Sequence, residues 1–282
     1  MSDSRRCARF VVPVIGLALL IGGCAGHAVG VTAVKLNGAS ATGKHGSKGL
    51  PAPVADIRRT DPLAYLRQVE ERAARLQQYR LTFWRQERLG LAPRLGELER
   101  ITVDYRKSPF SVKFVWLDDD SEYTQVVYVH GKNDNKVVLL PRRGLFGLKP
   151  APGRFRPEDA VAFGKSRNVI TDFGLHRMIQ RTLKRIADAV SHGGAKLRYV
   201  GLELLEGRPA HRFELQYPKA DIYPNKRQDL YVDAQTELPL GTYLWLPNGD
   251  LDALYLYLDL REYETPPGDE MFTIVQDAGG RS

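Results

Sequence analysis

The chain has 282 residues, of which 43% are hydrophobic, and its formal net charge is +8 at pH 7. This hydrophobic content is enough for one good-sized domain with an ordinary core. Both cysteines, Cys7 and Cys24, lie near the N-terminus, which excludes a disulfide framework, a thiolate zinc site and a cysteine nucleophile from the rest of the chain. The positive charge fits an anionic membrane surface, a nucleic acid or a general role in solubility, and it does not decide among them.

The first 24 residues are typical of an export signal. Three arginines precede an apolar run over residues 10–21, which is too short to cross a bilayer that needs about 20 residues. The run ends in two glycines and Cys24, a pattern that resembles the lipobox of bacterial lipoproteins. The resemblance implies that residues 1–23 are removed and that Cys24 then carries acyl groups. The alternative is an ordinary secretory signal with a chance cysteine.

The expected location follows from this signal. An acidic residue after the cysteine would resemble a signal for retention in the inner membrane, but Ala25 follows it here. We therefore expect a protein that is lipid-anchored in the cell envelope, in the outer membrane and facing the periplasm. Export argues against nucleic acid as a partner.

The remaining chain divides into a tether, a domain and a tail. Residues 24–60 show no apolar period and are rich in small residues, which predicts a flexible tether. The folded domain is expected over residues 61–264, and a flexible tail over 265–282. At the start of the domain, Asp61 and apolar residues at three- and four-residue steps predict an amphipathic helix of about 18 residues.

Strand-like segments with alternating apolar residues make up most of the domain. The first series covers residues 81–88, 98–106, 110–116, 123–130 and 136–140. A second helix is predicted from Thr171 or Asp172 to Val190. The second series covers residues 197–205, 210–217, 228–232, 238–246 and 251–262. About ten to eleven strands without β-α-β alternation predict an α+β protein built on one curved antiparallel sheet.

A long segment rich in proline and glycine separates the two series. It spans residues 141–171 and contains Phe146 and Phe163. It also carries seven cations, which are Arg142, Arg143, Lys149, Arg154, Arg156, Lys165 and Arg167. The segment is either a solvated surface or a basic rim that pairs with phosphate headgroups while the two phenylalanines enter acyl chains.

The order of these elements resembles the lipoprotein-localisation fold of LolA and LolB, which the sensor domain of RseB shares. Within that superfamily the chain is similar to a bacterial family of unknown function. The residues that carry the likeness are Tyr105–Trp116, Tyr128–Lys136, Gly207–Phe213 and Leu230–Pro239. The resemblance implies an open, strongly curved half-barrel whose concave face, covered by helices, forms an apolar cavity. Lipoprotein transfer does not carry over, because the tether and the central segment are longer here.

Alternation along the strands and the stripe of the second helix suggest which side chains face that cavity. The candidate ligand-binding residues are Leu81, Phe83, Phe114, Trp116, Phe146, Phe163, Met178 and Phe213. The alternative for each of them is a place in a solid core.

Motifs for catalysis do not occur in the sequence. It has no serine-hydrolase elbow, no HExxH zinc motif and no phosphate-binding glycine loop, and its six histidines lack the spacing of metal ligands. The acidic run Asp118–Asp120 with Glu122 fits a hairpin turn better than a calcium loop. We therefore expect a non-enzymatic protein without cofactor or metal that binds an acyl chain, a phospholipid or a lipidated partner. A protein-interaction or sensor module is the alternative.

Overall fold

The structure, a computed structural model, describes residues 56–90, 92–144, 148, 150–218 and 223–275. The chain divides into two units, Met1–Thr32 and Ala33–Ser282, and every described residue belongs to the second. Cys24, most of the expected tether, Phe146 and Lys149 lie outside the described residues. Within the described ranges, no helix combines the length and the apolar character that a membrane span requires.

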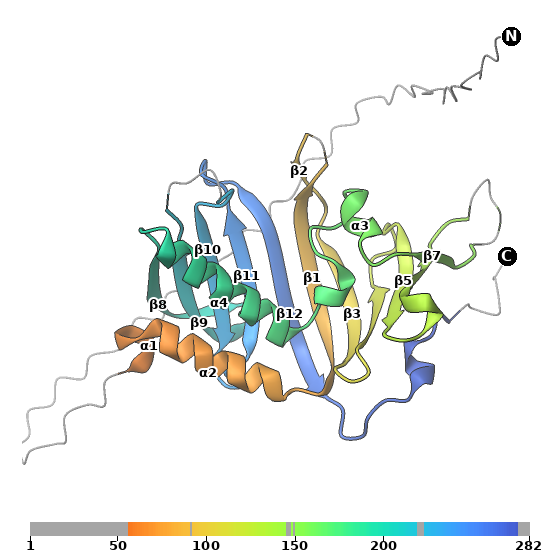
Figure 1. The fold of residues 1–282 in the computed structure, drawn as a ribbon, viewed down its shortest axis with the longest axis horizontal. Coiled ribbons are helices and arrows are strands. Elements are labelled where there is room, and N and C mark those ends of the chain that lie inside the picture. Colours follow the sequence, from red (N-terminus) through yellow and green to blue (C-terminus); the bar gives the residue numbers. More distant parts are fainter. Residues whose placement is uncertain (1–55, 91, 145–147, 149, 219–222, 276–282) are drawn as a thin grey trace, which may run out of the picture. The chain divides into compact units, whose positions relative to one another are not determined.

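One open antiparallel sheet forms the body of this unit (Figure 1). Its strands in chain order are β1 Gln78–Leu89, β2 Arg94–Leu95, β3 Glu99–Arg106, β4 Ser111–Trp116, β5 Tyr123–Val129, β6 Val137–Pro141, β7 Gly153–Phe155, β8 Lys196–Leu205, β9 Arg208–Gln216, β10 Arg227–Asp233, β11 Pro239–Trp245 and β12 Leu251–Glu262. Their order in space is β7-β6-β5-β4-β3-β1-β12-β11-β10-β9-β8, and β2 pairs with β1. The predicted α+β class with a curved, open antiparallel sheet is confirmed.

The first and the last long strands meet in the middle of the sheet. β1 pairs with β12 from Tyr79 opposite Glu262 to Glu87 opposite Ala253. On its other edge, β1 pairs with β3. The sheet therefore consists of two meanders, β1 to β7 and β8 to β12, which are joined along this central pair.

Two long helices lie on one face of the sheet, which we call the concave face (Figure 1). The two long helices are α2 Pro62–Arg75 and α4 Leu175–Ser191, and the two short helices are α1 Ile57–Thr60 and α3 Asp159–Ala162. The Asp61 carboxylate accepts a hydrogen bond from the backbone N–H of Ala64 and caps α2, with Pro62 in the first turn. α2 contacts α4.

The helices differ from their predicted bounds. α2 has 14 residues rather than about 18, because Leu76 is extended and the chain enters β1 at Gln78. α4 begins at Leu175 rather than at Thr171 or Asp172. Ile170–Asp172 form a separate 3-10 turn before it, and Gly174 at the N-cap of α4 has a φ of 132°, in the region that favours glycine.

Parts of the expected tether, central segment and tail have regular structure. α1 occupies the last four residues of the expected tether, and β7 and α3 lie within the central segment. In the expected tail, Asp269–Phe272 form a 3-10 turn. Phe272 is buried against Val127 and Val129, so this part of the tail is packed on the sheet.

Apolar side chains fill the space between the helices and the concave face. The most deeply buried members of this core include Leu66, Val69, Ile101, Val103, Ile179, Ile186, Phe213 and Val232. A second apolar cluster lies on the opposite face of the sheet and includes Leu205, Ala210, Tyr231, Leu240 and Leu256. The central strands are therefore apolar on both faces.

Truncating Phe213 tests the core between α2 and the sheet. Its side chain is 0% exposed, and its ring stacks on that of Tyr65 in α2 with the centroids 5.4 Å apart. We expect Phe213→Ala to lower the free energy of unfolding by about 3–5 kcal/mol, because the lost contacts leave a cavity. Urea denaturation measures this change. Phe163→Ala is the matched control, since Phe163 is 69% exposed, and a change above about 0.5 kcal/mol there would contradict the assignment.

A buried histidine connects α1 to the sheet. His211 of β9 lies between Arg58 of α1 and Tyr199 of β8. Arg58 Nη1 donates to His211 Nε2 at 2.5 Å, and His211 Nδ1 lies 3.0 Å from Tyr199 Oη. An arginine only donates hydrogen bonds, so Nε2 must be unprotonated and the ring neutral. Burial and, next, the charge of Arg58 lower the pKa of His211, against a weaker opposing effect of Asp56.

Acidification should therefore destabilise the domain through His211. The unfolded chain, with a histidine pKa of about 6.5, binds a proton more readily than the folded state. The stabilisation is complete above about pH 6.5 and is lost as the pH falls through the folded pKa. Urea denaturation at about pH 7.5 and about pH 5.5 measures the loss. We expect a smaller loss in His211→Gln, and an equal loss in that variant would refute the assignment.

Candidate functional site

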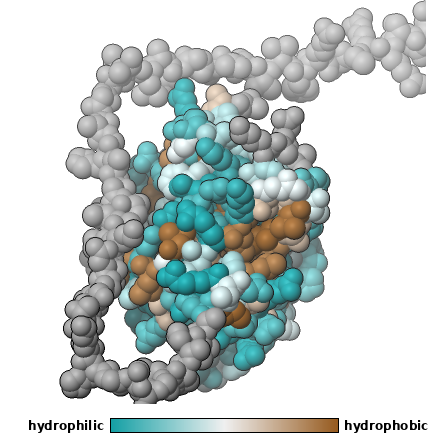
Figure 2. Space-filling view, turned by 90° about the vertical axis from the view of Figure 1, so that its left-hand side faces the viewer, coloured by the Kyte–Doolittle hydropathy of each residue, from teal (hydrophilic) through white to brown (hydrophobic). Residues whose placement is uncertain are grey.

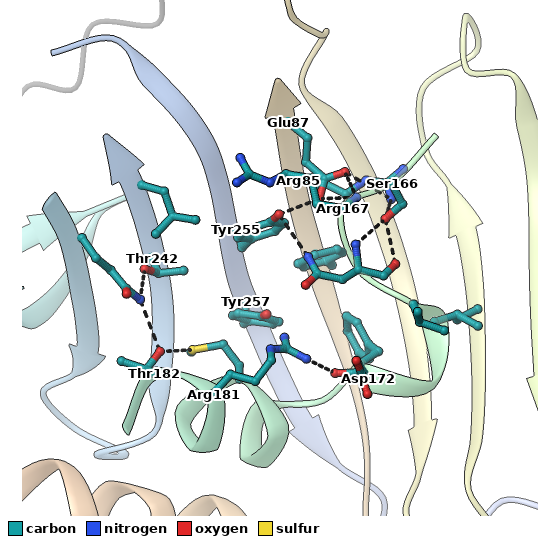
Figure 3. A pocket seen from close by; sticks show the side chains of 18 of the residues that line it. Arg85, Glu87, Ser166, Arg167, Asp172, Arg181, Thr182, Thr242, Tyr255 and Tyr257 are labelled. Atoms are coloured by element: carbon teal, nitrogen blue, oxygen red, sulfur yellow. Dashed lines mark hydrogen bonds and ion pairs between the residues drawn. The ribbon is translucent and has the colours of Figure 1, made fainter. Parts of the chain in front are cut away.

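A cavity of about 230 Å³ opens on the concave face between the middle of the sheet and α4 (Figure 3). Its walls come from β1, β4, β10, β11, β12, α4 and the segment 166–173, which we call the strap. The volume is slightly below the range of about 300–1,000 Å³ that is usual for small-molecule sites. The cavity therefore suits a ligand that is more slender than a typical drug-sized molecule.

Aromatic rings form the floor of the cavity. The Phe83 ring lies at the centre, with its centroid 5.2 Å from those of both Tyr257 and Phe173 and 6.2 Å from that of Tyr255. Phe114 contacts Phe173 edge to face at 5.0 Å. Cross-strand register explains this grouping, because Phe83 of β1 lies directly opposite Tyr257 of β12 on the same face of the sheet.

The inward row of β1 changes from aromatic to ionic after Phe83. Arg85 lies opposite Glu99 of β3, and its Nε donates to Glu99 Oε2 at 2.6 Å. Glu87, one step further, is buried and accepts a hydrogen bond from Tyr255 Oη at 2.5 Å. Burial first, and then the charge of Glu87, raise the pKa of Tyr255, so its phenol stays protonated and donates. The charges of Arg85 and Glu87 at this end of the cavity are therefore satisfied by partners within the protein.

The strap is held to the sheet by polar contacts at that ionic end (Figure 3). Arg85 Nη1 donates to Ser166 Oγ at 3.3 Å, and the backbone N–H of Arg167 donates to Glu87 Oε2 at 3.3 Å. Asn168 Nδ2 donates to Tyr255 Oη at 3.1 Å. These contacts place the strap across the concave face, where Phe173 at its end completes the aromatic floor.

The helix side of the cavity carries neutral polar groups that satisfy one another. Gln228 Nε2 donates to Thr182 Oγ1 at 3.2 Å and to Thr242 Oγ1 at 3.0 Å. Tyr217 Oη donates to Gln228 Oε1 at 2.7 Å. Arg181 and Arg185 of α4 also line the cavity, four residues apart on one side of the helix. The cavity is therefore aromatic at its floor and basic along α4.

Three of the predicted ligand-binding residues line this cavity. They are Phe83, Phe114 and Met178. Leu81 and Trp116 lie on the same inward rows but are buried in the core beyond the cavity. The indole Nε1 of Trp116 donates to Glu99 at 2.8 Å.

The other predicted residues lie elsewhere. Phe213 is covered by α2, where it stacks on Tyr65, and so belongs to the solid core rather than to the cavity wall. Phe163 follows α3 on the surface and does not reach the cavity. Phe146 and Cys24 lie outside the described residues.

The basic rim differs from the one expected from the central segment. Of those of its cations that the structure describes, only Arg167 lines the cavity, and it pairs with Asp252 at 2.6 Å. Arg142 instead donates to the carbonyl of Asp118, and Lys165 pairs with Glu122, so both hold the hairpin before β5. The Asp118 carboxylate pairs with Arg100 at 2.5 Å as part of the same turn.

Sequence reasoning missed the two arginines of α4. A signal for them exists, since arginine recurs every four residues at 177, 181 and 185, beside the apolar stripe that contains Met178. Cations at this spacing line one edge of a helix. The edge faces a cavity only because the strap and β12 leave space there, and local sequence does not reveal that space.

Several solved structures are similar to the described fold. One is the MucA/MucB complex of Pseudomonas aeruginosa (16% identity, 76% of this chain and 61% of that chain, TM-score 0.46). Another is the lipoprotein LppX of Mycobacterium tuberculosis (14% identity, 74% and 98%, TM-score 0.40). A third is a LolA superfamily protein of Nitrosomonas europaea (11% identity, 75% and 96%, TM-score 0.33). The chain spans less than two thirds of the MucB chains that it matches.

Sequence comparison gives the family. No curated protein is similar enough in sequence to count as a relative. Residues 76–266, more than half of the chain, match the model of DUF1571, described as a protein of unknown function. The predicted membership of an uncharacterised family is thus confirmed, and the chain belongs to the DUF1571 family.

Proposed function

We propose that this protein is an envelope lipoprotein that binds an amphiphile in the cavity on the concave face. The observation that carries the proposal is the combination of an aromatic floor with a basic side. Phe83, Phe173 and Tyr257 offer apolar surface to an alkyl chain, and the arginines of α4 stand beside it. An apolar cavity with a few convergent polar groups is the usual form of a small-molecule site.

The proposal includes no chemical reaction. The buried carboxylate of the lining, Glu87, already accepts hydrogen bonds from Tyr255 and from the backbone of Arg167. These contacts hold Glu87 as a structural acceptor between the strap and β12. The role that fits this lining is binding or carriage.

The lipid anchor is the second part of the proposal. Cys24 follows two glycines at the end of the apolar leader, and an acylated Cys24 would hold the domain at the outer membrane, facing the periplasm. A ligand taken from or delivered to the bilayer would then be within reach of the cavity.

A protein-interaction or sensor module is the second candidate, and the edge of the sheet favours it. β8 is the longer of the two strands that end the sheet among the described residues, so one row of its backbone groups can pair with an added strand. Figure 2, which views the molecule from this side, shows hydrophobic side chains gathered on a largely hydrophilic face. Leu202 on β8 and Val190 near the end of α4 are exposed.

Crosslinking in intact cells separates the two candidates. Photo-crosslinking residues at exposed positions of β8 should capture one stoichiometric protein partner if the edge is an interaction site. Crosslinks to lipid alone, from positions at the cavity mouth, favour the amphiphile.

Filling the cavity should weaken ligand binding. Ile170 of the strap lines the cavity and is only half-buried, so Ile170→Trp adds volume there without opening the core. We expect the affinity for dansyl-undecanoic acid, a fluorescent fatty acid, to fall at least about tenfold. Val190→Trp makes a similar change at an exposed position of α4 and should bind like the wild type. Unchanged binding in Ile170→Trp, with an unchanged unfolding curve, would place the ligand elsewhere.

Replacing the lipidated cysteine should release the protein. We expect Cys24→Ser to move the domain from the membrane to the soluble envelope fraction, because the acyl anchor cannot form. Immunoblotting of separated fractions measures the distribution. Cys7→Ser, in the part of the leader that is removed, is the matched control and should stay at the membrane. Membrane retention of Cys24→Ser would overturn the anchor.

A further inference from the structure

We infer that the cavity selects a single-chain amphiphile with an anionic headgroup, a carboxylate or a phosphate, bound by Arg181 and Arg185 of α4. The inference rests on the proposed function of the cavity and names the class of its ligand. It also orients the ligand, with the head at α4 and the tail over the aromatic floor.

Two of the four arginines in the lining are neutralised by the protein. Arg85 pairs with Glu99 at 2.5 Å and lies 4.0 Å from Glu87. Arg167 pairs with Asp252 at 2.6 Å, and Asn225 donates to the same carboxylate oxygen at 2.7 Å. These two guanidinium groups hold the strap and the sheet together and do not call for an external anion.

The other two arginines have no such carboxylate. Within the described part of the chain, no carboxylate oxygen lies within 4.0 Å of the guanidinium of Arg181 or of Arg185, and the Asp172 side chain pairs with Arg177 instead. One arm of Arg181 donates to the Asp172 carbonyl at 2.6 Å, which fixes the group at the mouth of the cavity (Figure 3). A guanidinium has five N–H donors, so the remaining ones are available to a ligand.

The neighbouring phenol does not supply a negative charge. Burial raises the pKa of Tyr257 to about 12, while the charge of Arg181 acts weakly in the opposite direction. Tyr257 is therefore neutral at physiological pH and contributes only an apolar ring to the floor.

The uncharged polar groups of the wall are already paired with one another. The Gln228 amide donates to both Thr182 and Thr242, and the Thr242 hydroxyl donates to the Asp229 carbonyl at 2.9 Å. A neutral headgroup such as a sugar would find few free partners and would have to break these bonds. Among the polar groups of the lining, the guanidinium groups of α4 therefore gain the most favourable interactions when a ligand binds. Their positive charge selects an anionic headgroup.

The volume limits the tail. A cavity of about 230 Å³ is smaller than the usual drug-sized site, so it suits one alkyl chain better than the two chains of a phospholipid. A fatty acid or a monoalkyl phosphate meets both requirements.

The test compares four ligands that share a dodecyl chain. The ligands are dodecanoate, dodecyl phosphate, dodecyltrimethylammonium and dodecyl maltoside, each titrated below its micellar concentration against the neutral probe N-phenylnaphthylamine. We expect both anions to displace the probe at concentrations at least about tenfold lower than the cation and the maltoside, and this preference to shrink as salt is added. The two anionic arms show whether carboxylate or phosphate fits better.

Variants of α4 assign the preference to its arginines. Arg181→Gln and Arg185→Gln should each weaken the anions by about tenfold, which corresponds to about 1.4 kcal/mol, and leave the maltoside unchanged. Lys184→Gln is the matched control, because it removes a cation from the same helix at a position outside the cavity lining.

The outcomes separate this inference from the proposed function. If all four ligands bind equally, or if a variant that combines Arg181→Gln with Arg185→Gln keeps the preference for anions, the inference is wrong although the cavity still binds amphiphiles. If none of the four ligands displaces the probe from the wild type, the proposed function fails as well.

Discussion

The change from aromatic to ionic side chains along one strand is the constraint that shapes the site. Side chains of a strand alternate between two faces, so Phe83, Arg85 and Glu87 must all point to the concave face. Burying a charged side chain costs desolvation free energy unless the charge is paired or hydrogen-bonded. Glu99 and Tyr255 meet this requirement from the two neighbouring strands, and the backbone of the strap completes it. The same contacts that satisfy the charges therefore hold the strap across the concave face.

The helix α4 contributes side chains both to the core and to the opening of the cavity. Its apolar stripe, with Ile179 and Ile186, packs into the core. The adjacent edge carries Arg181 and Arg185 beside the opening. A shift of this helix around its axis would move core and rim together, because both are rows of one rigid element. The packing of α4 in the core thus fixes the position of the Arg181 and Arg185 guanidinium groups at the cavity opening.

Much of the fold could be predicted from local sequence, and much of the site could not. Alternation identified most of the long strands, as for Ser111–Trp116, because Val112, Phe114 and Trp116 on one face alternate with Ser111 and Lys113 on the other. The strap and the short elements β7 and α3 escaped prediction, since tertiary contacts rather than propensity define them. Phe83 and Phe213 show why cavity walls are harder. Both side chains point to the concave face of the sheet. Phe213 belongs to the solid core because α2 packs over it, whereas Phe83 lines the cavity.

The junction of β1 with β12 sets the order in which the domain can fold. The two strands stand at opposite ends of the domain sequence, and each supplies the partner that the other needs in the middle of the sheet. Closing so long a loop costs entropy before the contacts repay it, which makes folding slow in proteins of high contact order. A chain that emerges with its N-terminus first exposes β1 long before β12 exists. The first meander therefore has an unpaired edge at β1 until β12 has been made. Such a chain stays incompletely folded, and so able to pass through a translocation channel, until synthesis is nearly complete.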